Sequence, residues 1–226
     1  MTLLDRAQGA VNIAFHGLGP PGPGIDAEAR KYFIDTGLFL AVLDEVREYS
    51  WVELSFDDGY ASDVEIALPA LIARGISARF FPLAGRLGST GHVSASGVRE
   101  LAAAGMAIGS HGMKHCSWRG LGRRAMHEEL VGARNRLAAA AGTPIDTAAC
   151  PFGSYDRRVL AALREQGYAR VFTSDRRRAR TGAWLQPRYS VRRDDTIQTI
   201  RDDILAPQQF PGRIKSALSA RVKAWR

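Results

Sequence analysis

Cysteine is scarce in this chain of 226 residues, and the two that are present, Cys116 and Cys150, have neither the CxxC spacing of a zinc site nor the density of a secreted disulfide scaffold. Apolar runs are also short, and none approaches the roughly 18 residues that a membrane-spanning helix needs. Residues 1–11 carry charged side chains where a signal peptide would be apolar. We therefore expect a soluble cytoplasmic domain, whose 46% hydrophobic content suffices for a core.

Lysine is scarce too, since it stands only at positions 31, 114, 215 and 223, and arginine therefore dominates the net charge of +8. Residues 1–113 hold 13 acidic and 8 basic residues, whereas residues 114–226 hold 10 acidic and 23 basic ones. The basic second half should attract anions. Its segment 170–193 shows neither aromatic interleaving nor a helix-turn-helix pattern, so we expect no nucleic acid partner.

Short apolar or β-branched runs alternate with helix-like stretches almost from end to end. Strands are predicted over residues 11–15, 51–56, 77–83, 106–110, 147–151 and 170–174. Helices are predicted over residues 37–49 after a cap at Asp35 or Thr36, from Ser62 or Asp63 to Arg74, from Ser94 or Ser96 to about Gly105, and over 123–141 and 156–166. This alternation predicts an α/β fold with a parallel sheet or barrel.

Two adjacent carboxylates, Asp57 and Asp58, follow an apolar strand, and Gly59 after them permits a tight turn. Such carboxylates are costly to bury unless a cation or hydrogen bonds stabilise them. Because neighbouring side chains diverge, one is expected to bind a metal and the other to move a proton. The alternative is a strand-end turn with an aspartate cap.

Two of the five histidines, His111 and His115, lie four residues apart after another predicted strand. On a helical turn or a tight loop they can share a metal ion, although they could equally be two solvent-exposed histidines. Together with Asp58 they form a candidate site of two histidines and one carboxylate, which leaves positions open for water and substrate. A third segment, residues 149–156, ends a strand in a turn whose backbone N–H groups could face a developing oxyanion.

At these three segments the sequence resembles the polysaccharide deacetylase family, also called carbohydrate esterase family 4 or the NodB-homology domain. The family motif TFDDG has its counterpart in Ser55–Gly59, the motif H[ST]xxH in His111–His115, and the motif RxP[YF]G in Ala149–Gly153. The resemblance covers roughly residues 10–200 and points to the branch that modifies exopolysaccharides. It implies a distorted (β/α)7 barrel, which we place at residues 1–210.

The resemblance also implies the chemistry. Asp58, His111 and His115 would hold a divalent metal, most often zinc, with cobalt, nickel and manganese as alternatives, and Asp57 would be the general base. The backbone N–H of Phe152 would stabilise the oxyanion. The expected activity is hydrolysis of an acetyl group, N-acetyl foremost and O-acetyl as an alternative, on a glycan or sugar conjugate.

Two departures from the family pattern concern the motifs themselves. The motif arginine is replaced by Ala149, and the serine or threonine after the first histidine is replaced by Gly112. We expect Arg188, in the segment 187–193 at the last barrel strand, to orient the base instead. The alternative is that Arg188 is a surface arginine.

A third departure concerns the general acid, because no histidine follows His127 and the family's late histidine motif has no counterpart. His16 resembles the histidine of the Tyr-His element in the exopolysaccharide branch. A histidine suits proton donation because its reference pKa is about 6.5. We therefore predict that His16 protonates the leaving amine, with a structural turn histidine as the alternative.

Substrate contacts are predicted at Tyr155, in the third segment, and at Trp118 and Trp184, whose rings could stack on sugars. A formal dinucleotide fingerprint at residues 17–22 is rejected, because its prolines prevent a helix from opening there. No GxSxG or GxxxxGK[ST] motif is present, which argues against a serine hydrolase or a nucleotidase.

The C-terminal residues 211–226 form a predicted basic amphipathic helix, which either docks on the domain or binds an anionic membrane surface. Two alternatives to the leading hypothesis follow. One is a deacylase of a lipid-linked sugar, peripheral at the inner membrane face. The other is a non-catalytic glycan-binding or metal-binding relative.

A group of four arginines leaves two interpretations open. They could bind an acidic glycan, or they could be ordinary surface residues; the four are Arg176, Arg177, Arg178 and Arg180.

Overall fold

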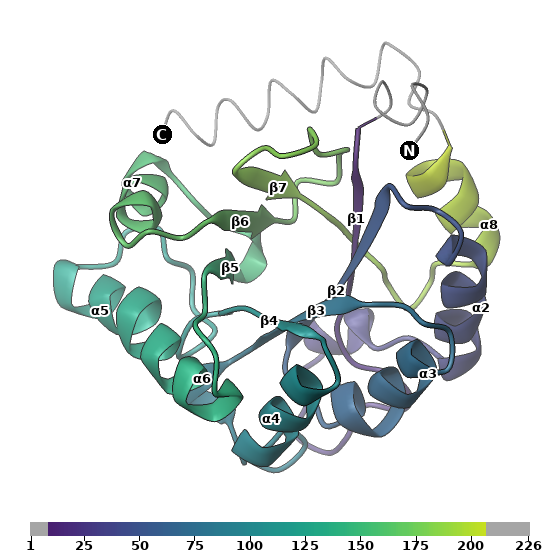
Figure 1. The fold of residues 1–226 in the computed structure, drawn as a ribbon, viewed down its shortest axis with the longest axis horizontal. Helices are drawn as coiled ribbons and strands as arrows, with labels where there is room; N and C mark the ends of the chain where they lie inside the picture. The colour runs from purple at the N-terminus through teal and green to yellow at the C-terminus, as the bar shows by residue number, and fades with distance from the viewer. Residues whose placement is uncertain (1–8, 207–226) are drawn as a thin grey trace.

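Parallel strands form the centre of the molecule, and helices surround them in chain order (Figure 1). The computed structural model describes residues 9–206. One sheet has the strand order β4-β3-β2-β1-β8, formed by Ala107–Ile108, Ala78–Pro82, Val52–Asp58, Val11–Phe15 and Tyr189–Ser190. A second has the order β5-β6-β7, formed by Thr147–Ala149, Arg170–Thr173 and Leu185–Pro187.

The two sheets join into one distorted barrel. On one side a parallel bridge between Ser110 and Ala148 links the end of β4 to β5. On the other side β7 and β8 are separated by Arg188 alone, so a single extended segment pairs first with β6 and then with β1. The side chain of Asn12 on β1 donates hydrogen bonds to Gln186 Oε1 at 3.0 Å and Pro187 O at 3.1 Å, which ties β1 to β7. The predicted α/β barrel is therefore correct.

The α-helices are α2 (Thr36–Val46), α3 (Leu68–Ile72), α4 (Ala95–Ala103), α5 (Arg123–His127), α6 (Ala133–Ala141), α7 (Arg157–Glu165) and α8 (Ile197–Thr199). Within residues 9–206, three π-helical turns extend them: η2 (Asp63–Ala67) precedes α3, η4 (Glu128–Gly132) joins α5 to α6, and η6 (Ile200–Leu205) continues α8. The same range contains three short 3-10 turns, η1 (Ala29–Tyr32), η3 (Ala84–Arg86) and η5 (Pro151–Gly153). Among the described helices, none is long and apolar enough to cross a membrane.

Local sequence signals predicted most of these elements. Asp35, Ser94 and Asp156 cap α2, α4 and α7, because each side chain accepts a hydrogen bond from a backbone N–H of the first turn. The cap expected at Ser62 or Asp63 is different: Ser62 is the N-cap residue of η2 but makes no side-chain capping bond, since its Oγ accepts a hydrogen bond from Leu18 N at 3.2 Å. The strand β7 and the helix over residues 197–205 were not predicted. The predicted C-terminal helix at 211–226 lies outside the described residues.

An aromatic core fixes the strands that carry the candidate site. The rings of Phe56 and Phe80 stack with centroids 4.6 Å apart, and Phe15 packs edge-on against Phe39 of α2 at 5.2 Å. Because successive side chains of a strand point to opposite faces, the neighbours of Phe56 on β2 point the other way, into the barrel. Those neighbours are Ser55 and Asp57.

Candidate active site

The first feature inside the barrel is an ion pair between Asp57, at the end of β2, and Arg188. Asp57 is 2% exposed and Arg188 is fully buried. Arg188 Nη1 donates to Asp57 Oδ1 at 2.6 Å, and Nη2 donates to Oδ2 at 2.7 Å. Nη1 also donates to Ser55 Oγ at 3.0 Å. This bidentate contact fixes the plane of the carboxylate.

The ion pair also sets the charge of Asp57. Burial raises the pKa of this carboxyl, but the charge and hydrogen bonds of Arg188 outweigh burial and hold the pKa well below its usual range. Asp57 is therefore an ionised carboxylate at neutral pH.

Arg188 lies where the base-orienting group was expected. Ala149 forms a small buried cluster with Phe81 and Phe172. The guanidinium of Arg188 lies 5.4 Å from the ring centroid of Phe81 and 5.8 Å from that of Phe172. Arg188 lies between β7 and β8, where the chain passes from one sheet to the other. It thus contacts Asp57 in a chain that has Ala149 in place of the motif arginine.

Next to this pair, Asp58, His111 and His115 converge. One ligand atom from each lies within 4.8 Å of the others. His111 Nε2 is 3.6 Å and His115 Nε2 is 3.3 Å from Asp58 Oδ1. That oxygen is buried and has no hydrogen-bond partner among residues 9–206. An unsatisfied buried carboxylate oxygen facing two imidazole nitrogens is the donor set of a metal site.

The ring of His111 is oriented for such a site. Its Nδ1 lies 2.8 Å from the carbonyl oxygen of Ala149, so Nδ1 donates the proton and Nε2 keeps its lone pair. Burial lowers the pKa of His111, although Asp57 and Asp58 oppose this shift, and the ring is therefore neutral. A neutral imidazole is the form that binds metal ions.

Backbone strain gathers at the same place. Asp58 (φ 73°), His115 (φ 53°) and Phe152 (φ 58°) adopt the left-handed region although none is glycine. Such conformations cost energy and cluster at functional sites. The ring of Phe152, 66% exposed, lies over His115 with centroids 4.4 Å apart. The three motifs thus meet at the carboxyl ends of their strands, as expected for a βα fold.

Glu129 supports this cluster and was missed by the sequence analysis. It is 2% exposed and accepts hydrogen bonds from Met113 N at 2.8 Å, Lys114 N at 3.1 Å and Trp118 Nε1 at 3.2 Å. It therefore holds the loop between the two histidines. The signal that could have found it is a glutamate beside Leu130 on the apolar face of the helix over 123–141.

Glu129 also explains the glycine of the second motif. Gly112 has φ 83°, and a Cβ on it would collide with Glu129 Oε2. A serine or threonine at this position is therefore incompatible with this placement of Glu129.

We expect Glu129→Gln to weaken divalent-metal binding about 10–100-fold, because residues that orient a ligand loop typically contribute that much. The charge that accepts three hydrogen bonds is lost, and the loop bearing His115 becomes less ordered. Calorimetric titration with Zn²⁺ measures the effect. The matched control is Glu128→Gln, an exposed neighbour on the same helix. Equal affinities of the two variants would show that Glu129 does not position the loop.

His16 stands at the end of β1 beside Asp57. Its Nε2 lies 4.0 Å from Asp57 Oδ2, and its ring packs against that of Tyr32 with centroids 4.7 Å apart and planes tilted by 31°. Its Nδ1 is buried and finds no hydrogen-bond partner in the described part of the chain. Burial lowers the pKa of His16, although Asp57 and Asp58 act to raise it. The distance of 4.0 Å between His16 Nε2 and Asp57 Oδ2 is longer than a direct hydrogen bond, and one water molecule could bridge the two groups.

The predicted oxyanion donor lies in the turn η5. The N–H groups of Gly153 and Ser154 are used within the turn, by Cys150 O at 2.9 Å and Pro151 O at 3.0 Å. We find no backbone hydrogen bond from the Phe152 N–H within residues 9–206. This group is therefore free to bind a substrate oxygen beside His115.

The two predicted tryptophan platforms are wrong. Trp118 is fully buried, and its Nε1 donates to Glu129, so its ring cannot meet a sugar. Trp184 precedes β7 and lies at the amino end of the strands, opposite the end that carries Asp57. Its ring is covered by Arg164, whose guanidinium carbon is 4.4 Å from the centroid.

Tyr155 is also misplaced as a substrate contact, since it is 1% exposed. Its hydroxyl donates to Asp175 Oδ2 at 2.8 Å, the same oxygen that accepts from Thr173 Oγ1. The tyrosine instead stabilises the turn after the third motif.

The fold and the site define an α/β barrel with a candidate metal site, and comparisons with known proteins identify its family. A family model described as polysaccharide deacetylase matches residues 46–171. The chain therefore belongs to the polysaccharide deacetylase family, as its three motifs predicted. A Bacillus subtilis (strain 168) protein named as a polysaccharide deacetylase, YxkH, is 26% identical over 124 residues, which are 55% of this chain and 44% of that protein. The chain thus spans less than half the length of this relative.

Solved structures share the fold. The Streptococcus pyogenes deacetylase PplD, solved with acetate, superimposes with a TM-score of 0.76 at 16% identity, over 87% of this chain and 98% of that one. The Bacillus cereus polysaccharide deacetylase BC0361 gives 0.75 at 16% identity, over 87% and 69% of the two chains. IcaB from Ammonifex degensii gives 0.68 at 24% identity, over 81% and 92%. At these identities the likeness shows the barrel, and the chemistry has to be argued from this chain's own residues.

Proposed function

We propose that the protein is a metal-dependent deacetylase that hydrolyses an acetyl group, N-acetyl foremost, on a glycan or sugar conjugate. Membership of the polysaccharide deacetylase family supports the substrate class. The observation that carries the proposal is the convergence of Asp58, His111 and His115 beside an ionised Asp57.

The residues present fit a divalent metal ion. Asp58 Oδ1 is buried without a hydrogen-bond partner in the part of the chain described, and the Nε2 atoms of His111 and His115 face it. Asp58, His111 and His115 would hold the ion, a set that suits zinc and leaves coordination positions open. Such an ion would supply Lewis acidity, which polarises an acyl carbonyl and lowers the pKa of water towards about 7.

The chain's own groups would then handle the protons. Asp57 accepts the proton of the attacking water, and its Oδ2 is the oxygen that faces both His111 Nε2, at 3.9 Å, and His16 Nε2, at 4.0 Å. Arg188 keeps the carboxylate in one orientation throughout. The Phe152 N–H donates to the oxyanion that develops on the acetyl carbonyl. His16, whose Nε2 faces Asp57 Oδ2, would take up the proton that Asp57 has accepted and deliver it to the departing amine nitrogen.

The direct test is release of acetate from N-acetylated oligosaccharides by Zn²⁺-loaded protein. We expect His111→Ala to lose nearly all acetate release and to bind Zn²⁺ more weakly, because one nitrogen ligand is missing. His127→Ala, an exposed histidine on α5, should behave as the wild type. Equal acetate release by all three proteins would refute the proposed site.

The role of His16 can be separated from that of the metal ligands. We expect His16→Gln to lower kcat on an acetamide substrate about 10²–10⁴-fold, the usual contribution of a general acid, with Zn²⁺ affinity retained. On an aryl acetate the loss should be small, because a phenolate leaves without protonation. His127→Gln is the matched control. An equal loss on both substrates would exclude proton donation by His16.

The two alternative functions lack a favouring observation. A non-catalytic relative was suggested by the missing motif arginine, but Arg188 makes the contact to Asp57. A lipid-linked substrate at a membrane was suggested by residues 211–226, which lie outside the described residues. We therefore do not propose either.

A further inference from the structure

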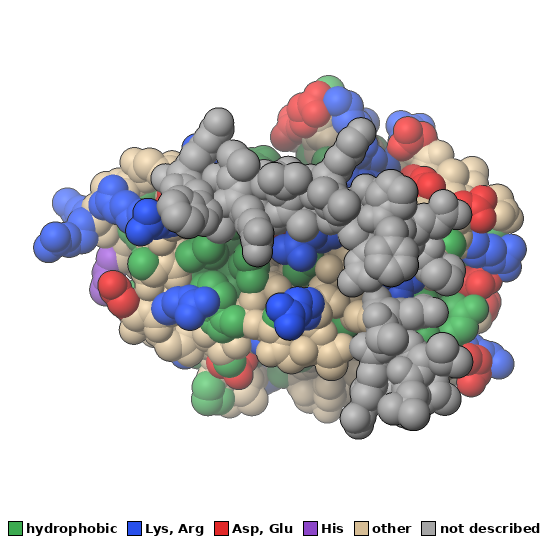
Figure 2. Space-filling model, turned by 90° about the horizontal axis from the view of Figure 1, so that it is seen from above, with side chains coloured by type: hydrophobic (Ala, Val, Ile, Leu, Met, Phe, Trp, Pro, Cys, Tyr) green, Lys and Arg blue, Asp and Glu red, His purple; other side chains and the backbone are tan. Residues whose placement is uncertain are grey.

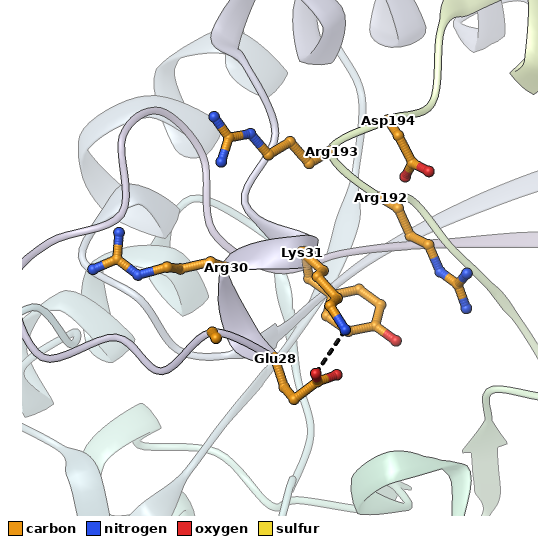
Figure 3. Close-up of a pocket in the computed structure, with 8 residues that line it drawn as sticks. Glu28, Arg30, Lys31, Arg192, Arg193 and Asp194 are labelled. Atoms are coloured by element: carbon orange, nitrogen blue, oxygen red, sulfur yellow. Dashed lines mark hydrogen bonds and ion pairs between the residues drawn. The ribbon is translucent and has the colours of Figure 1, made fainter.

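A cavity of about 800 Å³ has Tyr32, a neighbour of His16, in its lining. Figure 3 shows the residues that line it. It lies between the 3-10 turn η1 and the segment after β8, two parts of the chain that are far apart in sequence. They are joined by a hydrogen bond from Arg193 N to Lys31 O at 2.8 Å. Its lining consists of Ala27, Glu28, Arg30, Lys31, Tyr32, Arg192, Arg193 and Asp194.

The charge of this cavity is positive. Four cationic and two anionic side chains line it. One of the anionic side chains, Glu28, forms an ion pair with Lys31, whose Nζ lies 2.6 Å from Glu28 Oε1 (Figure 3). No ion pair within residues 9–206 involves Arg30, Arg192 or Arg193. On the face seen in Figure 2, basic side chains lie in several separate groups.

Two of these arginines are partly fixed before any ligand binds. Arg30 Nε donates to Ile25 O at 2.8 Å, which leaves its terminal nitrogens for a ligand. The guanidinium carbon of Arg192 lies 5.9 Å from the ring centroid of Tyr32. A fixed guanidinium loses less entropy when it forms a hydrogen bond, so the cavity is suited to bind a planar or tetrahedral anion.

Tyr32 connects the cavity to the catalytic groups. It lines the cavity, and its ring packs against that of His16, whose Nε2 is 4.0 Å from Asp57 Oδ2. A sugar in the cavity would therefore lie next to the sugar whose acetyl group reaches Asp57. The volume also lies within the range of about 300–1,000 Å³ that is usual for ligand sites.

We propose that this cavity is a substrate subsite for an anionic group, a sugar carboxylate or phosphate, on the residue next to the acetylated sugar. The inference rests on the proposed function and adds to it a preference for acidic glycans. Guanidinium groups recognise both anions through paired hydrogen bonds, because a carboxylate and a phosphate each present two acceptor oxygens on one negatively charged group. The cavity is expected to bind either anion through these oxygens.

The test compares three oligosaccharides of equal length on the Zn²⁺-loaded full chain. One is a neutral N-acetylglucosamine oligomer, one alternates N-acetylglucosamine with glucuronate, and one is an N-acetylglucosamine oligomer with a terminal phosphate. We expect lower KM values for one or both acidic substrates than for the neutral one. Whichever acidic substrate gains identifies carboxylate or phosphate as the anion.

Arg192→Gln combined with Arg193→Gln should reduce this preference about 10–100-fold, the loss expected for one or two hydrogen bonds to a charged group. The matched control is Arg123→Gln combined with Arg124→Gln on α5, which removes the same charge from exposed positions. A preference lowered equally by both double variants would indicate a general charge effect and overturn the subsite.

Failure of the subsite and failure of the proposed function give different results. Acetate release that is equally efficient on all three substrates overturns the subsite and leaves the deacetylase intact. No acetate release from any substrate overturns the function. In that case calorimetric titration with the glucuronate oligomer tests the subsite by itself. Only binding that is weakened by the combined Arg192→Gln and Arg193→Gln substitutions would support the subsite.

Discussion

Arg188→Met will remove most of the deacetylase activity, by a factor of at least about 10², and will also destabilise the folded protein. The fully buried guanidinium is the partner that holds Asp57 in orientation through two hydrogen bonds. Removing one partner of a buried ion pair leaves an uncompensated charge and typically costs about 3–5 kcal/mol. Denaturant unfolding and acetate release measure the two effects.

The loss of stability in Arg188→Met is expected to depend on pH. In the wild type the pKa of Asp57 is held below its unfolded value, so its stabilising contribution is present at neutral pH and is lost as the pH falls through the folded pKa. Without Arg188, burial dominates and raises the pKa of Asp57. The difference in the free energy of unfolding between the wild type and Arg188→Met should therefore be largest at neutral pH and smaller in acid.

Arg170→Met is the control for this variant. Arg170 pairs with Glu53 at 3.1 Å, but both side chains are substantially exposed, and such pairs contribute about 0–1 kcal/mol. A second variant tests the motif position directly: Ala149→Arg in the Arg188→Met background should restore part of the activity. Wild-type kcat in Arg188→Met alone would disprove the assignment of Arg188 as the residue that positions the base.

The second large effect is expected from the neighbouring aspartates. Asp57→Asn should lower kcat about 10²–10⁴-fold and still bind Zn²⁺, because asparagine cannot accept the proton of water and Asp57 is not among the ligands. Asp58→Asn should lose Zn²⁺ affinity and, with it, activity. Calorimetric titration with Zn²⁺ and acetate release, measured on both variants, separate the two roles.

Asp35→Asn serves as the control, because asparagine caps a helix as well as aspartate and α2 is therefore preserved. Two outcomes would reverse the assignment. Loss of Zn²⁺ binding in Asp57→Asn would make that residue a ligand. Full activity in the same variant would require a different general base.

Several parts of the fold follow from short-range signals. The strand β1, residues 11–15, was predicted correctly, and Asp35 and Ser94 were each one of the two residues predicted as caps, because hydrophobic periodicity and capping act within a few residues. By contrast, β7 has only three residues, too few for a periodic pattern. The helix 197–205 was missed as well.

For the candidate site, the chain's order of motifs was sufficient to indicate Asp57, Asp58, His111 and His115. Each stands after a strand, and parallel strands bring their carboxyl ends to one edge. The sequence by itself thus determined the family, the barrel and the donor set.

Only the tertiary structure decided which other side chains reach this donor set. The sequence left Arg188 as either the residue that orients the base or a surface arginine, and the structure places it against Asp57, 131 residues away. Glu129, which the sequence did not indicate, reaches the loop of His115 from a helix. The same applies to Trp118, which the sequence placed beside a sugar and the structure places in the core. These outcomes depend on which segments pack together across the barrel, and contacts between distant segments leave no periodic signal in a single sequence.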